Sequence, residues 1–165
     1  MKKTALITVA ILLSMSLILN LYFITQKNFD ITGFSALDTT NYAEAKISIT
    51  EDSIFLTSNC KTLAMIISKE QTQNIILGAI NQTTPRPLTH DTIKNILDVF
   101  DIEILQVQIN DMREETYLAK IFLKKENKIV SIDVRPSDAL AIAVRYQLPV
   151  LVNKDLLEKH GQDSC

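Results

Sequence analysis

The sequence predicts an α+β fold: a single compact domain with an antiparallel or mixed β-sheet and about four helices, after an N-terminal transmembrane helix. Three observations support this prediction. An uncharged, mostly apolar run occupies residues 4–24. Several short runs of apolar and β-branched residues, separated by brief polar breaks, are typical of strands. Other segments carry apolar residues at helical spacing.

The apolar run follows Lys2 and Lys3, and its 21 residues are long enough to cross a bilayer as a helix. No small-residue cleavage pattern follows it, and Tyr22 and Phe23 suit the membrane interface. We therefore predict an uncleaved signal anchor over residues 1–27, with a cleaved signal peptide as the alternative. The positive-inside tendency then makes this a single-pass protein of the cell membrane, with its domain outside the cytoplasm.

Residues 28–42 are polar and aperiodic, and we interpret them as a linker. The domain is expected over residues 43–161, followed by a tail at 162–165. Its first part predicts an antiparallel meander of three short strands, with the sequences AKISIT, SIFLTS and TLAMIIS.

Two amphipathic segments follow the meander, at residues 68–82 and 89–101. Ser68 and Thr89 are their predicted N-caps, because a hydroxyl oxygen can accept a hydrogen bond from a free helix N–H. Gly78 lies inside the first helix, where it costs stability unless another group packs closely against it.

The second half of the domain predicts three strands, at residues 102–109, 115–124 and 128–134. The middle run carries apolar residues on both faces, so it is expected to be a central strand. A helix at 137–147, a short apolar run and a final helix from Asn153 to about Gly161 complete the domain. Asn153 is the expected N-cap, and Gly161 is expected in the left-handed conformation after the last turn.

The domain beyond the anchor is acidic, because only 17 Lys and Arg residues, three of them at or before position 27, stand against 19 Asp and Glu residues. Such a domain does not attract nucleic acid by its overall field, so binding would need a local group of cations. The two cysteines, Cys60 and Cys165, lie in no metal-binding motif. The sequence favours free thiols here, with a disulfide as the alternative outside the cytoplasm.

Two polar segments, RPLTHD (residues 86–91) and DVRPSD (residues 133–138), lie where helices begin. In a structural interpretation, Thr89 and Ser137 cap the helices and nearby acids complement the helix dipoles. In a functional interpretation, the free N–H groups of a helix start and an arginine fork hold a phosphate. The residues alone leave both interpretations open.

The functional interpretation assigns roles in phosphodiester hydrolysis, where a histidine or a carboxylate can transfer protons. The candidate catalytic residues are His90, Asp91, Asp133 and Asp138. The candidate substrate-binding residues are Arg86, Thr89, Arg135 and Ser137. A divalent cation, Mg²⁺ or Mn²⁺, could activate the attacking water, and its candidate ligands are Asp133 and Asp138.

The segments RPLTHD and IDVRPSDALAIAVRYQLPVLV resemble the hallmark of the bifunctional nuclease domain family, R-P-x-T-H-D followed by D-x-R-P-S-D-A-[LI]-A-[LI]-A. The similarity runs from about Tyr42 to Gly161. The resemblance implies a self-associating α+β domain that cleaves DNA and RNA, with the eight site residues in matching positions. Ser68 and Gln71 depart from it, because the family often has a glycine and a glutamate there.

We therefore predict a membrane-anchored, homo-oligomeric nuclease that hydrolyses DNA, RNA or both. The alternative is a non-catalytic module of the same fold that binds a ligand, a protein or its own copy. The acidic charge and Gln71 favour that alternative, whereas the intact pair of motifs favours the enzyme. If the nuclease prediction is correct, one cleft should bring together Arg86, His90, Asp133, Arg135 and Asp138.

Overall fold

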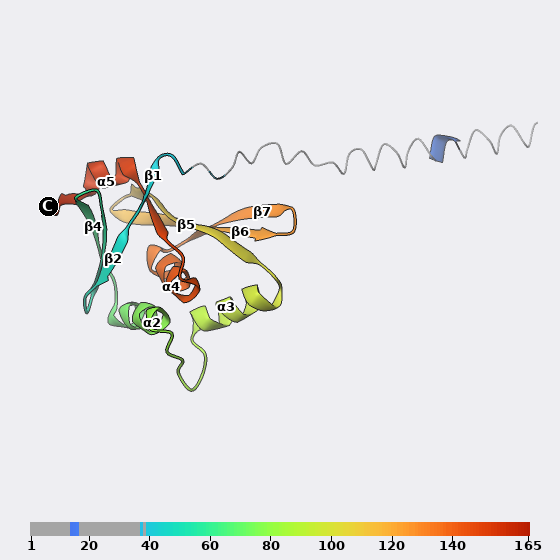
Figure 1. Ribbon diagram of the computed structural model, residues 1–165, viewed down its shortest axis with the longest axis horizontal. Helices are drawn as coiled ribbons and strands as arrows, with labels where there is room; N and C mark the ends of the chain where they lie inside the picture. The colour runs from blue at the N-terminus through green and yellow to red at the C-terminus, as the bar shows by residue number, and fades with distance from the viewer. Residues whose placement is uncertain (1–13, 17–36, 38) are drawn as a thin grey trace, which may run out of the picture. The chain divides into compact units, whose positions relative to one another are not determined.

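Two β-sheets and four helices make up residues 39–165 in the computed structural model, which describes residues 14–16, 37 and 39–165 (Figure 1). The helices of this unit are α2 (Lys69–Ala79), α3 (Thr89–Val99), α4 (Pro136–Tyr146) and α5 (Lys154–His160). The predicted α+β domain is confirmed. The predicted membrane span lies outside the described residues apart from a helical turn at 14–16. Among the described helices, none combines the length and apolar character needed to cross a membrane.

The larger sheet has five strands in the order β1-β8-β5-β6-β7. Strands β5 and β8 pair in parallel, and the other neighbours pair antiparallel. The central position predicted for the middle run is confirmed, because β6 lies between β5 and β7. These strands are β1 (Tyr42–Glu44), β5 (Glu103–Arg113), β6 (Thr116–Lys125), β7 (Lys128–Val134) and β8 (Val150–Asn153). Strand β1 was not predicted, since its three residues show no periodicity and depend on pairing with β8.

The smaller sheet contains the predicted meander, β2 (Lys46–Ile49), β3 (Ser53–Ser58) and β4 (Lys61–Ile66). Its fourth strand is β9 (Gln162–Asp163), which pairs antiparallel with β4. The interpretation of residues 162–165 as a tail is therefore wrong. Two residues are too few to show a strand pattern in the sequence, and the pairing with β4 defines them.

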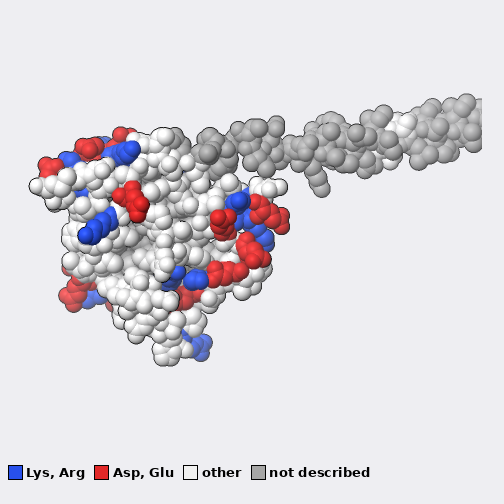
Figure 2. Space-filling view, viewed as in Figure 1, with Lys and Arg blue, Asp and Glu red and all other residues white. Residues whose placement is uncertain are grey.

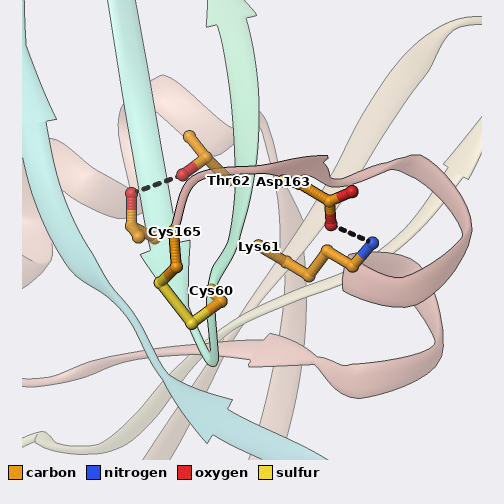
Figure 3. Close-up of a disulfide and its surroundings, with 6 residues drawn as sticks. Cys60, Lys61, Thr62, Asp163 and Cys165 are labelled. Atoms are coloured by element: carbon orange, nitrogen blue, oxygen red, sulfur yellow. Dashed lines mark hydrogen bonds and ion pairs between the residues drawn. A yellow bond between two sulfur atoms is a disulfide. The ribbon is translucent and has the colours of Figure 1, made fainter.

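A disulfide joins Cys60 to Cys165, with Cα atoms 5.1 Å apart (Figure 3). The prediction of free thiols is wrong. The pairing of β9 with β4 carries the end of the chain to the β3–β4 turn, where Ser164 N–H donates to the Cys60 carbonyl. An ion pair of 2.7 Å between Lys61 Nζ and Asp163 Oδ1 lies beside the bond. This proximity arises from tertiary pairing and has no signature in the sequence.

Helix α2 begins as predicted, since Ser68 Oγ accepts from the N–H of Gln71 and the Gln71 side chain accepts from Ser68 N–H. The α3 start differs from the prediction, because Leu88 is the N-cap and Thr89 is the first helical residue. Leu88 makes no side-chain capping bond, but Asp91 Oδ2 accepts from Leu88 N–H at 2.8 Å, which is the reciprocal half of a capping box.

Helix α4 also begins earlier than predicted, with Arg135 as N-cap and Pro136 as the first helical residue. The fixed φ of proline suits that position, so Ser137 lies inside the helix and does not cap it. The α5 cap by Asn153 is confirmed. Gly161 has φ −75°, so the predicted left-handed conformation is wrong, and the chain continues directly into β9.

Helix α4 is the centre of the core, with five successive residues buried from Ala139 to Ala143. It contacts β5 and β6 of the larger sheet as well as α2 and α3. The alanines let these elements approach closely, and apolar side chains from both sheets fill the interior. The largest fully buried side chains are Ile54, Leu56, Leu63, Ile75, Val107, Ile109, Leu140, Val150 and Val152.

Reduction of the disulfide is predicted to lower the free energy of unfolding by about 2–4 kcal/mol, because the bond closes a loop of about 100 residues in the unfolded chain. Urea titration of the oxidised and reduced protein measures this difference. The Cys60→Ser/Cys165→Ser protein is the control and should not respond to reductant. Identical midpoints for the oxidised and reduced wild type would contradict the prediction.

Candidate functional site

A pocket of about 180 Å³ lies where the starts of α2, α3 and α4 meet, and we call it the His90 pocket. Three helices and the residue preceding α4 contribute its walls, so tertiary packing creates it. Its lining residues are Glu70, Gln71, Asn74, His90, Arg135, Ser137, Asp138 and Ala141. Four of the eight predicted site residues therefore meet here.

Asp138 is the central group of the pocket, because both of its carboxylate oxygens are bound. Arg135 donates from Nε to Oδ2 at 2.7 Å and from Nη2 to Oδ1 at 3.1 Å. His90 Nε2 lies 3.2 Å from Oδ1. Partial burial by itself would raise the pKa of Asp138, but Arg135 and His90 together hold that pKa below its ordinary value. The carboxylate is thus ionised near neutral pH, and His90 Nε2–H donates to it.

His90 is mostly buried, with its side chain 13% exposed. Its other ring nitrogen, Nδ1, is buried without a hydrogen-bond partner among the described residues. With Nε2–H bound to Asp138, the lone pair of the neutral ring lies on this buried Nδ1.

Ser137 and Gln71 form the wall of the pocket between α4 and α2. Gln71 Nε2 donates to Ser137 Oγ at 2.9 Å, while Gln71 Oε1 accepts from Ser68 N–H at 2.9 Å. A glutamate at position 71 could only accept, so Ser137 would have to donate to it. The departure at Gln71 thus reverses one hydrogen bond at the pocket wall. Sequence reasoning recognised the departure but did not predict this contact.

Asp91 lies next to His90 in sequence but does not line the His90 pocket. Its Oδ1 accepts from Arg145 Nε at 2.6 Å, and its Oδ2 caps α3. Partial burial would raise the pKa of Asp91, but the hydrogen bonds from Arg145 and Leu88 hold it below the ordinary value. This contact with Arg145 gives Asp91 a structural position, away from the predicted catalytic group.

Arg145 was not predicted as a site residue, yet it fixes the three helices around the pocket. Its side chain is 4% exposed. Nη1 donates to the carbonyls of Asn74 and Ala141, at 3.2 and 2.8 Å, and Nη2 donates to Asn74 Oδ1 at 2.8 Å. Together with Asp91, these contacts join α4 to α2 and α3. No sequence pattern indicated this role, because an arginine late in a helix usually lies in solvent.

Gly78 allows this arginine to reach α2. A Cβ atom at position 78 would lie 2.5 Å from Arg145 Nη1 and 3.0 Å from Val144 Cγ2. The close packing that the sequence required to justify this glycine is therefore present.

Arg86 and Thr89 do not line the His90 pocket; both are exposed, Arg86 before α3 and Thr89 at its first position. Arg86 can contact a ligand long enough to extend beyond the pocket, but it is not part of the pocket itself.

Asp133 is also outside the His90 pocket. It faces Lys120 across the β6–β7 pair, whereas its neighbour Ile132 faces the buried Ile121. Because successive strand residues point to opposite faces, Asp133 points away from the core side of the sheet, where α4 packs. The predicted cleft of five residues is thus wrong for Arg86 and Asp133 and right for the other three.

The predicted metal site finds no matching set of ligands in the described part of the chain. There, no group of three or more His, Cys, Asp or Glu side chains is placed to hold a metal ion. Asp133 lies apart from the pocket, and both oxygens of Asp138 are bound by Arg135 and His90. These residues do not fit an Mg²⁺ or Mn²⁺ site, and the metal requirement stays a prediction.

Arg135 is the group of the pocket that can bind an anion, although Glu70 and Asp138 also line it. The Arg135 side chain is 72% exposed, and it stands at the positive end of the α4 dipole. The surface in Figure 2 carries acidic and basic residues side by side, with no continuous basic area on the face shown. Attraction of a phosphate at this site would therefore be local.

The sequence profile of the bifunctional nuclease domain matches residues 54–164, which is more than half of the chain and includes every residue of the His90 pocket. The chain belongs to the bifunctional nuclease domain family. The predicted family is thereby confirmed, and both motif segments lie inside the matched region.

Two plant relatives carry the name of the family. Bifunctional nuclease 2 of Oryza sativa subsp. japonica is 34% identical over 105 residues, and bifunctional nuclease 1 of Arabidopsis thaliana is 35% identical over 103 residues. These alignments cover 61% and 60% of this chain and 32% of each plant protein. An uncharacterized protein of Mycobacterium tuberculosis is 30% identical over 99 residues, 60% of this chain and 58% of its own. The matched region thus spans about a third of the plant proteins.

Gly78→Ala is predicted to destabilise the fold by about 1–3 kcal/mol, because the new methyl group overlaps the buried Arg145. In an Arg145→Ala background the same substitution should cost at least about 1 kcal/mol less, because the overlapping group is gone. Chemical denaturation of the four proteins of this cycle measures the coupling.

The control for helix propensity compares Gln73→Ala with Gln73→Gly, at an exposed position of the same helix. The alanine variant should be more stable than the glycine variant by about 1 kcal/mol. Equal effects of Gly78→Ala with and without Arg145 would show that the arginine does not require the glycine.

Proposed function

We propose that this domain is a nuclease that hydrolyses phosphodiester bonds of DNA, RNA or both. The observation that carries the proposal is the group formed by His90, Arg135 and Asp138, in which an imidazole and an exposed guanidinium share one carboxylate at a helix start. Membership of the bifunctional nuclease domain family supports it, as do the names of the plant relatives.

In the proposed reaction, Arg135 binds the phosphate. Its Nε and Nη2 are turned toward Asp138, and its exposed guanidinium edge can donate to the phosphate oxygens. Negative charge increases on those oxygens as water attacks phosphorus, and a fixed cation stabilises that charge. The positive end of the α4 dipole acts in the same direction.

His90 is the proposed proton carrier. With Nε2–H bound to Asp138, the nitrogen that takes the proton of the attacking water is Nδ1, exposed when substrate binds, and the same proton can then pass to the leaving oxygen. Asp138 orients the ring, and Arg135 holds Asp138 in place. Ser137 and Gln71 support this arrangement from the α2 side. Asp91 contributes indirectly, because its contact with Arg145 holds α3, and hence His90, against α4.

His90→Gln is predicted to reduce the cleavage rate about 100-fold or more, because the glutamine amide can still donate to Asp138 but cannot exchange a proton. The measurement is cleavage of labelled single- and double-stranded DNA and RNA by the full chain, with Mg²⁺, with Mn²⁺ and with a chelator. His160→Gln is the matched control, since His160 is exposed in the last turn of α5, and this variant should keep full activity.

A folded His90→Gln protein with wild-type activity would remove the catalytic role of the histidine. A wild-type protein that binds nucleic acid in every condition but never cleaves it would favour the non-catalytic module. Loss of cleavage in the presence of the chelator would show that the reaction needs a divalent cation. The substrate itself would then have to supply some of the ligands of that cation.

We further propose that residues 4–24 anchor the protein in the cell membrane, with the domain outside the cytoplasm. The disulfide supports this location, because such bonds persist mainly in oxidising compartments. The apolar sequence and the preceding lysines support the anchor itself. Homo-oligomerisation stays a prediction; β7 is an edge strand of the larger sheet, with Val130 and Ile132 exposed.

The anchor predicts that the mature protein keeps its first residues and sediments with membranes. Mass spectrometry of the purified protein tests the N-terminus, and a mature end near residue 30 would contradict the anchor. Protease added to intact cells should degrade the domain if it lies outside. Protection of the domain in intact cells but not in lysed cells would contradict the proposed orientation.

A further inference from the structure

A second and larger pocket adjoins the His90 pocket, and the two share Gln71, Arg135 and Ser137 as a common wall. Its volume is about 580 Å³. It extends from that wall to β4 and to the β5–β6 turn, and we call it the Tyr117 pocket. A ligand held at Arg135 can therefore extend directly into it.

The Tyr117 pocket has a different chemical character from its neighbour. Tyr117, Met112 and Ile67 are partly buried and pack against the core. Ile66 stands at the rim with 88% of its surface exposed, which is unusual for a side chain of its size. Burial raises the pKa of the Tyr117 phenol, so the ring stays neutral at physiological pH. The pocket thus offers an apolar surface and an aromatic ring beside a cation.

We propose that the Tyr117 pocket seats a base of single-stranded nucleic acid, next to the phosphate held by Arg135. This inference rests on the proposed function. Bases of single strands stack on aromatic side chains, and the charged backbone follows neighbouring cations. A paired base is stacked inside its duplex and cannot enter a side pocket unless it leaves the stack. The pocket therefore selects unpaired segments.

The arrangement of charge supports one orientation of the strand. Arg135 lies at the wall shared with the His90 pocket, whereas Glu115 lies in the Tyr117 pocket. A carboxylate repels a phosphate, so the backbone stays on the Arg135 side and the uncharged base points toward Tyr117. The sulfur of Met112 and the side chain of Ile66 can contact a purine or a pyrimidine, so binding of the base in the Tyr117 pocket does not depend on the nucleotide sequence.

The test compares two short fluorescent single strands, one natural and one without bases at its central positions. They are bound to the full-length His90→Gln protein, whose cleavage is predicted to be about 100-fold slower or more. Anisotropy should show that base removal weakens binding about 10-fold. Tyr117→Ala should weaken binding of the natural strand by a similar factor and abolish the difference between the strands. Tyr117→Phe should restore it, because the ring remains.

Ile66→Ser is a second variant that removes apolar surface at the exposed rim without disturbing the core, and it should also weaken binding of the natural strand. Ile80→Ser is its matched control, since Ile80 is 60% exposed and lines neither pocket. It should bind as the parent protein does.

Equal binding of the two strands by the His90→Gln protein would overturn the proposal that the Tyr117 pocket binds a base, even if wild-type cleavage is confirmed. Base-dependent binding by a wild-type protein that never cleaves would keep the seat and reject the nuclease. A change in oligomeric state on Ile66→Ser, with binding unaltered, would overturn the seat and identify the pocket as an interface between copies.

Discussion

The buried guanidinium of Arg145 is the interaction on which the candidate site depends. A charge that is 4% exposed is tolerated only when it is fully bound, and here Asp91 and three acceptors on α2 and α4 bind it. A lysine could not replace it, because the planar fork reaches α2 and α3 at once. The position of His90 opposite Asp138 follows from this junction, since α3 contributes the histidine and α4 the carboxylate.

The two polar motifs combine structural and chemical residues in adjacent positions. In RPLTHD, His90 turns toward the pocket and Asp91 toward Arg145, because neighbouring residues of a helix point about 100° apart. In DVRPSD, Asp133 belongs to the far face of the sheet, whereas Arg135 begins α4 and meets Asp138 one turn later. A segment that matches the family motif therefore does not assign a chemical role to each of its residues.

Arg135 is the group of the His90 pocket that can bind a phosphate in an otherwise acidic domain. Two carboxylates, Asp138 and Glu70, also line the pocket, so it carries no net positive charge before a ligand arrives. Affinity for a polyanion would then come from short-range hydrogen bonds and from apolar contacts in the neighbouring pocket, and less from long-range attraction.

The sequence predicted the α+β class, the meander, the central strand β6 and the four helices, because each of these leaves a local pattern of apolar residues. Through the two motifs it also predicted eight site residues, of which His90, Arg135, Ser137 and Asp138 meet in one pocket. Three features became clear only from the folded chain: Asp91 binds Arg145, Asp133 points away from the core side of its sheet, and Cys60 meets Cys165. The first and third join residues 54 and 105 positions apart in the chain. The second depends on which face of the sheet α4 covers. A local pattern of residues carries no information about such neighbours.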